Sequence, residues 1–569
     1  MSNIRLSGKL FFKSIFLPII TFSGIGALFA LLIKKFIYET AYRYDSGYLS
    51  QLTQVAASQK YAFYFFILFL FISYEFVSKA RLADAEETIL AVEHKRVNFY
   101  RGQILFLFII DFIVSLFVMC LTVFALKYFF IATRDTVVYT VLLIFLTYFL
   151  NCGAAICFGA AIALRLKRVA GYAVLLIVAV LASPIAQVTA STFSAFGINI
   201  YYILNFFEFF LPNYSFTPNF VFWEPILPYR WALALLWIAA SLLLSGEKLF
   251  YLPERRAGKK IFTVAMAAIV AVTALTVAIP TSSVEKNEDT TQGDFHDCYY
   301  YIMKEKPQKE KKADFSALKY DISMKIRNRL HMDVKVTVDK NNLESYDFTL
   351  YHGYKLRKVT DDKGEKLRYD RKNDSITVYG SGDTEYIEFV YSGYSPVFYS
   401  NMQGVSLPGD FAYYPIPGWH FVYDVENQNL NSVMLENDVD FSVRVDAPYS
   451  DIFCNLDSCG KNEYRGRSNA LTFVRGFVKQ YDMGSVSVVQ SYLNGCKTEY
   501  YLSKTIAEMK DAEKELNSSY TMDGKKILLV SAENQNNSGA LASDHIIMRK
   551  QIDSSSYMTE LEKLAGREE

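Results

Sequence analysis

The chain has few of the residues and motifs from which soluble catalytic sites are built. It has six histidines in 569 residues, and no two stand four apart as in an H-E-x-x-H zinc helix. It has no G-x-x-x-x-G-K-[ST] sequence and therefore no phosphate-binding loop of an ATPase. Its net charge of +1 gives no electrostatic case for a nucleic-acid partner. We therefore predict no enzyme, no catalytic residue, no metal site and no cofactor.

Cysteines are also sparse, with seven in the chain. Three lie in apolar stretches and are most simply buried small hydrophobes, namely Cys120, Cys152 and Cys157. In the polar half, Cys454 and Cys459 are close enough in sequence to close a small disulfide loop. Free thiols are the alternative, because four cysteines in so large a region form no disulfide framework.

Long apolar runs are plentiful, but only in the first half of the chain. A membrane-spanning helix needs roughly 20 predominantly apolar residues, and the bilayer forces such a run to be helical. Seven runs qualify: 14–33, 61–78, 104–126, 137–163, 169–189, 230–245 and 261–280. A signal peptide does not explain residues 1–33, because no small-residue cleavage pattern ends the run and more spans follow.

The basic residues of the connecting loops predict the orientation of these spans. If the N-terminus is cytoplasmic, the inner segments hold 16 Lys and Arg residues, and the outer loops hold 5 besides Lys127, which sits at the end of the third span. This bias favours an N-terminus inside. Seven spans then place the polar half outside, so we predict a multi-pass protein of the cell membrane with an extracellular C-terminal domain.

Two loops and one carboxylate stand out in the membrane half. Residues 79–103 have apolar residues at helical spacing and predict an inner helix that docks a partner or lies on lipid headgroups. The charged residues of this segment are Arg81, Asp84, Glu86, Glu87, His94, Lys95 and Arg96. The aromatic connection 190–229 predicts a segment that re-enters the membrane or lies on its outer face. Asp111 is the one acidic residue deep in a span, either functional or held between packed helices.

This layout resembles the permease subunits of type-2 ABC exporters over about residues 1–250. The shared features are two spans, a charged inner helix, three more spans, an outer re-entrant segment and a sixth span. The resemblance implies that Arg81–Gln103 contacts a separate cytoplasmic ATPase and that Phe206–Pro228 is the outer hairpin. It also implies a homodimer or heterodimer of permeases in the bilayer. The seventh span departs from the family.

The second half of the chain predicts a mainly-β domain after a charged linker. Residues 282–315 are rich in Lys and Glu, so we expect this linker to bury little. Alternating apolar residues predict strands over 332–339, 346–361, 374–380, 385–394 and 439–448, as in a β-sandwich. Toward the end, 502–516 and 558–565 predict helices, and 526–531 and 545–548 predict strands.

This half resembles the N-terminal β-domain of the membrane alanyl aminopeptidases, which are gluzincin zinc metallopeptidases. The resemblance rests on the strands from Tyr320 to Gly380, the sequences FVYSGY and LPGDFAYYPIPG, and the strand FSVRVDAP. It implies zinc chemistry that cannot be carried over, because the H-E-x-x-H is missing and Gly539–Ser543 lacks the recognition glutamate. Bacterial permeases fused to such a domain are known.

The sequence thus predicts an α-helical membrane domain (1–281), a charged linker (282–315), an aminopeptidase-like β-domain (316–500) and a truncated α/β segment (501–569). The leading hypothesis is an ABC-type permease subunit for an unidentified substrate. The alternatives are a membrane-anchored, inactive or split peptidase, which a partner chain could complete, and an extracellular peptide-binding sensor.

Overall fold

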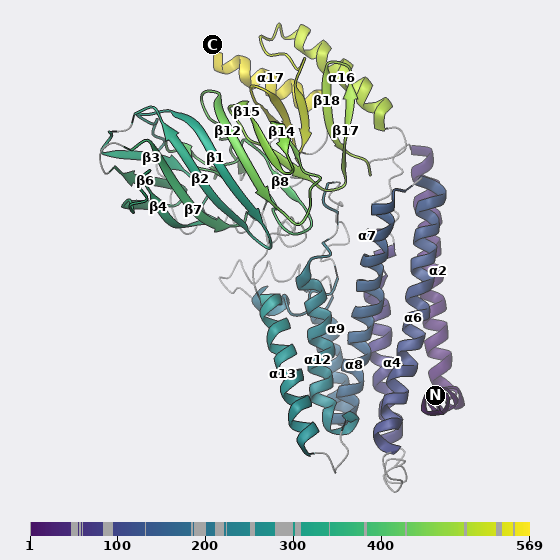
Figure 1. The fold of residues 1–569 in the computed structure, drawn as a ribbon. Helices are drawn as coiled ribbons and strands as arrows, with labels where there is room; N and C mark the ends of the chain where they lie inside the picture. The colour runs from purple at the N-terminus through teal and green to yellow at the C-terminus, as the bar shows by residue number, and fades with distance from the viewer. Residues whose placement is uncertain are drawn as a thin grey trace. The chain divides into compact units, whose positions relative to one another are not determined.

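The computed structural model describes most of the chain. The described residues are 2–46, 55, 58–59, 61–82, 95–130, 132–183, 186, 201–210, 221–223, 225–250, 256–278, 300–301, 309–340, 342–380, 384–395, 397–426, 429–493, 498–530, 538–549 and 552–568. The chain divides into two compact units (Figure 1). The first is Met1–Pro218 with Ile226–Pro280, and the second is Asn219–Pro225 with Thr281–Glu569. A short piece of the first half of the sequence therefore belongs to the second unit.

The first unit is a bundle of helices (Figure 1). In chain order they are α1 (Ser2–Lys13), α2 (Phe16–Ser46), α4 (Ala62–Leu82), α6 (Lys95–Phe130), α7 (Arg134–Ile144), η1 (Phe145–Leu150), α8 (Asn151–Arg165), α9 (Arg168–Leu181), α11 (Tyr201–Leu204), α12 (Pro228–Phe250) and α13 (Arg256–Ala278). Because α7, the π-helix η1 and α8 are continuous, they make one span of 32 residues, Arg134–Arg165.

Six helices of the described residues are long and apolar enough to cross a membrane. They match six of the seven predicted spans. The fifth, 169–189, is represented by α9, which is only 14 residues long as described. Apolar side chains remain exposed on the outside of the bundle, as lipid contact requires: only 11% of the best apolar window of α13 is buried.

The second unit is mainly β, with several sheets. The seven-stranded sheet has the order β14-β15-β12-β1-β2-β7-β4. Its strands are β1 (Ala317–Ile326), β2 (Leu330–Val338), β4 (Tyr354–Thr360), β7 (Tyr386–Gly393), β12 (Val439–Asp446), β14 (Asp457–Gly460) and β15 (Glu463–Ser468). In β2 every second residue is buried, so the alternation predicted from the sequence is confirmed.

Four smaller sheets complete the described strands of this unit. The three-stranded sheet holds β8 (Val405–Leu407), β13 (Phe453–Cys454) and β16 (Phe473–Arg475), and the two-stranded sheet holds β10 (Tyr423–Asp424) and β11 (Asn429–Leu430). The four-stranded sheet holds β3 (Ser345–Thr349), β5 (Tyr369–Lys372), β6 (Ser375–Tyr379) and β9 (Ile416–Pro417). The region is thus mainly β as predicted, but its strands divide among more sheets than the two of a simple sandwich.

The α/β end is built on a mixed five-stranded sheet of order β17-β18-β19-β21-β20. Its strands are β17 (Val478–Met483), β18 (Val486–Ser491), β19 (Lys526–Leu529), β20 (Gly539–Leu541) and β21 (His545–Met548). Helices α16 (Thr498–Glu515) and α17 (Ser554–Glu568) lie beside one another in this part (Figure 1). The predicted helices and strands after residue 500 are therefore confirmed, and the sheet extends back to Val478.

The charged residues of the linker 282–315 that the structure describes are exposed, as predicted, but Tyr301 and Phe315 are buried. Tyr301 is 3% exposed, and its hydroxyl donates to Asp374 Oδ2 at 2.7 Å. The Tyr300 ring stacks on His352 with 3.7 Å between centroids. The physical reason is that the average charge of the linker conceals aromatic residues, whose apolar area favours packing on the second unit.

Candidate functional site

The membrane unit contains a non-helical segment, Phe206–Phe210, that is bound by polar side chains of two helices. Asn151 Nδ2 of α8 donates to the Phe209 carbonyl at 2.9 Å, and Arg230 Nη2 of α12 donates to the same carbonyl at 3.0 Å. Trp237 Nε1 of α12 donates to the Phe206 carbonyl at 2.7 Å. We call Asn151, Phe206–Phe210, Arg230 and Trp237 the Phe209 cluster.

The Phe209 cluster lies deep in the helix bundle. Asn151 stands near the middle of the 32-residue span and is 2% exposed, and Arg230 is 3% exposed. The Phe209 ring lies 5.1 Å from the Phe66 ring and 5.7 Å from the Trp237 ring. Glu208 is also buried, at 3% exposure. This part of the connection 190–229 thus lies inside the helix bundle at the level of Asn151, as a segment that re-enters the membrane would.

The backbone of the span changes just before Asn151. Residues Phe145–Leu150 form the π-helix η1, and α8 then begins at Asn151. A π-helical turn is rare and occurs frequently at functional sites. Backbone carbonyls that are not in a helix need partners at membrane depth, and the Asn151 and Arg230 side chains supply them here. These groups bind a carbonyl, and their burial marks them as functional candidates.

Asp111 of α6 is fully buried in the same unit, at 0% exposure. Neither of its carboxyl oxygens has a hydrogen-bond partner among the described residues. It interacts electrostatically with the thiol of Cys152, which directly follows Asn151. The structure thus places the predicted intramembrane carboxyl inside the bundle, facing the span that carries the Phe209 cluster.

The other predicted site residues have mixed outcomes. Asp84, Glu86, Glu87 and His94 lie outside the described residues. Arg81 is in the last turn of α4, and Lys95 and Arg96 begin α6, so the charged segment connects these two helices. The side chains of these three basic residues are also outside the described part.

The possible disulfide between Cys454 and Cys459 is not formed, and both cysteines are free. Cys454 points into the core of the second unit at 7% exposure, and its thiol contacts Asn455 Oδ1 at 3.6 Å. Cys459 lies on β14, whose four residues are all exposed. Nearness in sequence therefore misleads, because the two side chains lie in different environments.

Asn151, Glu208 and Arg230 were not among the site residues predicted from the sequence. A signal for two of them was available, since Asn151 interrupts the apolar run 137–163 and Arg230 opens the run 230–245. No local pattern could show that both contact one carbonyl about 20 to 60 residues away in the chain, because that contact depends on how the helices pack.

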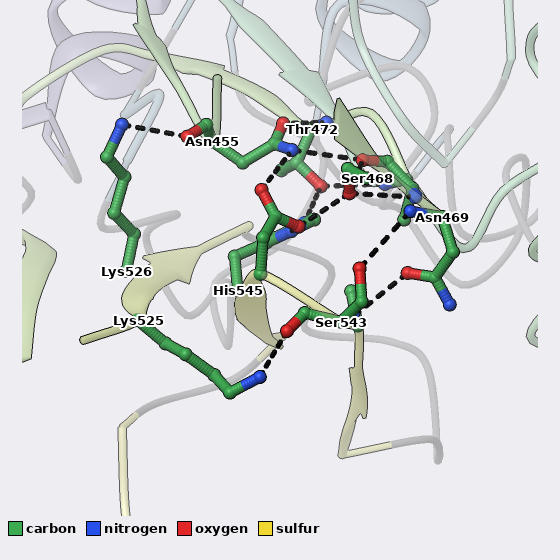
Figure 2. Close-up of polar contacts among 12 residues, drawn as sticks. Asn455, Ser468, Asn469, Thr472, Lys525, Lys526, Ser543 and His545 are labelled. Carbon is green, nitrogen blue, oxygen red and sulfur yellow. Dashed lines mark hydrogen bonds and ion pairs between the residues drawn. The ribbon is translucent and has the colours of Figure 1, made fainter. Parts of the chain in front are cut away.

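The second unit holds a connected network of polar side chains, of which Asn455, Ser468, Thr472 and His545 are labelled in Figure 2. Its central residue is Asp544. Asp544 Oδ1 accepts from Ser468 Oγ at 2.5 Å and from His545 Nδ1 at 2.7 Å. Asp544 Oδ2 accepts from Asn455 Nδ2 at 2.9 Å. His545 Nε2 lies 2.7 Å from Thr472 Oγ1. The network thus joins the start of β21 to segments at the ends of β13, β15 and β16, which belong to other sheets.

The order Thr472–His545–Asp544 has the connectivity of a nucleophile, a base and an orienting carboxylate. With the ring neutral and Nδ1–H directed to Asp544, Nε2 accepts the Thr472 hydroxyl hydrogen. However, Thr472 and His545 are both 0% exposed, and Thr472 Oγ1 already accepts the Gly409 N–H at 2.9 Å. No substrate can reach this hydroxyl, so the network stabilises the fold.

The charge of Asp544 is expected to make the second unit sensitive to acid. Burial by itself would raise the pKa of the Asp544 carboxyl, but hydrogen bonds from His545, Ser468 and Asn455 outweigh it and lower this pKa to about 2. The folded form then binds this proton less readily than the unfolded chain. The stabilisation is complete above about pH 4 and is lost as the pH falls toward 2.

We expect Asp544→Asn to remove about 2 kcal/mol of stability at neutral pH, since one pKa unit corresponds to about 1.4 kcal/mol. The variant should also show a smaller change in thermal midpoint between pH 5 and pH 3 than the wild type, because the contribution of Asp544 is absent. Thermal unfolding of the full chain in detergent measures both effects. Asp440→Asn, an exposed carboxylate on β12, is the control and should follow the wild-type profile. An Asp544→Asn variant as acid-sensitive as wild type would contradict the assignment.

No protein-family model matches this chain, and no curated protein matches it. Some solved structures are similar to part of it. An M1 zinc metallopeptidase from Deinococcus radiodurans has a TM-score of 0.30 and 12% identity, and the match covers 44% of this chain and 64% of that protein. Yeast leukotriene A4 hydrolase in complex with bestatin has a TM-score of 0.32 and 11% identity, covering 47% of each chain. The chain thus spans less than two thirds of either protein.

The part of the chain that the structure describes holds no group of side chains that fits a zinc ion. Among the described residues, no three His, Cys, Asp or Glu side chains gather as metal ligands would. The histidine of the α/β end, His545, is committed to Asp544 and Thr472. No catalytic step through zinc is therefore derived for this chain.

Proposed function

We propose that this chain is the membrane-spanning permease subunit of an ABC-type transporter, with energy supplied by a separate cytoplasmic ATPase. The observation that carries the proposal is the Phe209 cluster: a non-helical segment held at mid-span depth by Asn151 and Arg230. Irregular backbone at such depth is tolerated only where protein or a water-filled cavity surrounds it, and it recurs at transport sites. The buried Asp111 adds support, because its carboxyl oxygens have no hydrogen-bond partner among the described residues and it interacts with Cys152 of the same span.

The order of the elements fits this proposal. Helices α4 and α6 are joined by the charged segment that contains Arg81 and Glu87, which by its resemblance is the ATPase-docking element. In this proposal the segment lies on the cytoplasmic side and the second unit lies outside the cell. Two such chains, identical or related, enclose the path of the substrate. The second unit then recognises or admits the substrate, and its β fold performs no chemistry.

Copurification from the native membrane tests this proposal. We expect an ATP-hydrolysing subunit to accompany the wild-type chain, and the double substitution Glu86→Ala with Glu87→Ala to reduce that association at least about tenfold, since it removes two charges from a docking surface. The matched control is Asp135→Ala, an exposed carboxylate at the start of α7, which is predicted to lie at the opposite face of the membrane. Absence of any ATPase from the wild-type preparation would refute the permease function.

A further inference from the structure

Residues Val221–Trp223 belong to the second unit, although the membrane unit precedes and follows them in the chain. Their relative exposures are 0%, 1% and 0%. Val221 is part of the hydrophobic core that runs through the β sheets of that unit. We call Val221–Trp223 the anchor segment. Complete burial of three consecutive large side chains is unusual for a surface loop, which normally lies over a protein rather than inside it.

Backbone hydrogen bonds and aromatic rings hold the anchor segment. The Phe477 N–H donates to the Val221 carbonyl at 2.7 Å, and Gln403 Nε2 donates to the Phe222 carbonyl at 3.2 Å. The Phe222 ring lies 4.4 Å from the Tyr399 ring, and the Trp223 ring meets the Phe477 ring at 5.4 Å and 74°. The Trp223–Phe477 pair is edge-on, a geometry that strengthens aromatic pairs beyond the area they bury.

The second unit is shaped to receive this segment. A Cβ added at Gly476 would lie 2.0 Å from the Val221 carbonyl oxygen, so only glycine permits this approach. Trp223 has φ of 65°, in the left-handed region that non-glycine residues rarely adopt. Such a conformation persists only when the surrounding contacts over-determine it. The segment is therefore seated in a fitted site rather than resting on a surface.

The anchor segment is close in the chain to the Phe209 cluster on both sides. Trp223 precedes Arg230 by seven residues, which span at most about 24 Å when fully extended. The Arg230 end of that connection is fixed, because Trp231 Nε1 donates to the Ile226 carbonyl at 3.0 Å and the Arg230 N–H donates to the Leu227 carbonyl at 3.0 Å. On the other side, Phe210 precedes Val221 by eleven residues.

We propose that the anchor segment couples the second unit to the Phe209 cluster, so that binding to or movement of the outer unit regulates the permease site. The regulation of transport rests on the proposed function. The attachment of the second unit by the anchor segment does not depend on transport. The second unit is joined to the helices at the linker after Pro280 and at the anchor, and the anchor is the connection that leads directly to α12.

Cleavage of the linker separates the two connections. A protease site is placed between Thr291 and Gln292 of the full chain, and the purified protein is cleaved in detergent. We expect the second unit to remain bound to the helices through the anchor. In the Gly476→Val variant we expect the cleaved second unit to be released. The double variant Phe222→Ala with Trp223→Ala leaves the backbone of the β sheets unaltered. It should release the second unit at least about 100-fold faster than the cleaved wild type, because two large buried rings are lost. Gly566→Ala, with no atom within 4 Å of the new Cβ, is the matched control.

Hydrogen exchange on the uncleaved chain gives the second measurement. In the double alanine variant, the amides of 204–210 should exchange at least about tenfold faster, while those of β17 and β18 stay protected and show that the second unit is folded. Release of the wild-type second unit after cleavage, or its retention in both variants, would overturn the anchor. Unchanged exchange at 204–210 in the double variant would overturn the coupling. An intact anchor in a protein that associates with no ATPase would instead refute only the proposed function.

Discussion

Replacing Arg549 by methionine is expected to remove about 3–5 kcal/mol from the stability of the second unit, because it leaves a buried carboxylate without its counter-charge. Arg549 Nη2 donates to Asp410 Oδ2 at 2.5 Å, and both side chains are 0% exposed. The guanidinium also lies over the Phe398 ring, with 5.4 Å between Cζ and the centroid. Hydrogen exchange of the β19 and β21 amides in the full chain measures the loss, since core strands report global opening of their unit.

The partner substitution separates charge from packing. A double variant, Asp410→Leu with Arg549→Met, buries no charge and should regain most of the stability that Arg549→Met loses, because well-packed apolar side chains often replace a buried ion pair at little cost. Arg549 Nε and Nη1 have no hydrogen-bond partner among the described residues, which strengthens this expectation. The surface control is Lys514→Met, whose exposed pair with Asp511 should matter little. A double variant less stable than the single one would show that the ion pair itself stabilises the unit.

The Arg549–Asp410 pair also shows where prediction from the sequence ends. The two residues are 139 positions apart, and each stands in a stretch whose local pattern is otherwise apolar or turn-like. The strand 545–548 was predicted with its correct bounds, because a short apolar run is typical of a buried strand, and all four of its residues are buried. Arg549 directly follows this strand, and its contact with Asp410 depends on how segments distant in sequence pack. The periodicity of apolar residues carries no information on such a contact.

More of the membrane half could be predicted from the sequence, because the bilayer requires every spanning segment to be a long apolar helix. Apolar length alone located six spans. The positions of two segments outside the spans depend instead on contacts with residues distant in sequence. Phe206–Phe210 is pinned by Asn151 and Arg230, whereas Val221–Trp223, only a few residues later, packs on Phe477 and Tyr399. A single aromatic loop is thus divided between two units, which its uniform composition could not reveal. The resemblance noted from the sequence marked Phe206–Pro228 as one hairpin and did not reveal this division.

In the membrane unit, Gly159→Val is expected to cause the largest loss of folded protein of any single substitution in α8. A Cβ at this position would lie 2.4 Å from the Leu70 carbonyl oxygen and 3.1 Å from Ser73 Cβ, and the former is the backbone of α4. The helices approach this closely because glycine has no side chain, which is how small residues let membrane helices pack. Ser73 Oγ donates to the Ile156 carbonyl at 2.6 Å across the same interface, so separating the helices also breaks this bond.

Forcing the two backbones apart should cost about 3 kcal/mol or more, at the upper end of over-packing effects, because no flexible side chain can move aside. Size-exclusion chromatography of the detergent-solubilised protein after a series of heating steps measures the remaining folded fraction. Gly26→Ala on α2, with nothing within 4 Å of the added Cβ, is the matched control and should keep the wild-type midpoint. Since α8 begins at Asn151, loosening of its contact with α4 should also release the Phe209 carbonyl, seen as faster exchange at 204–210. A Gly159→Val protein with the wild-type midpoint would mean that α4 and α8 do not pack at this glycine.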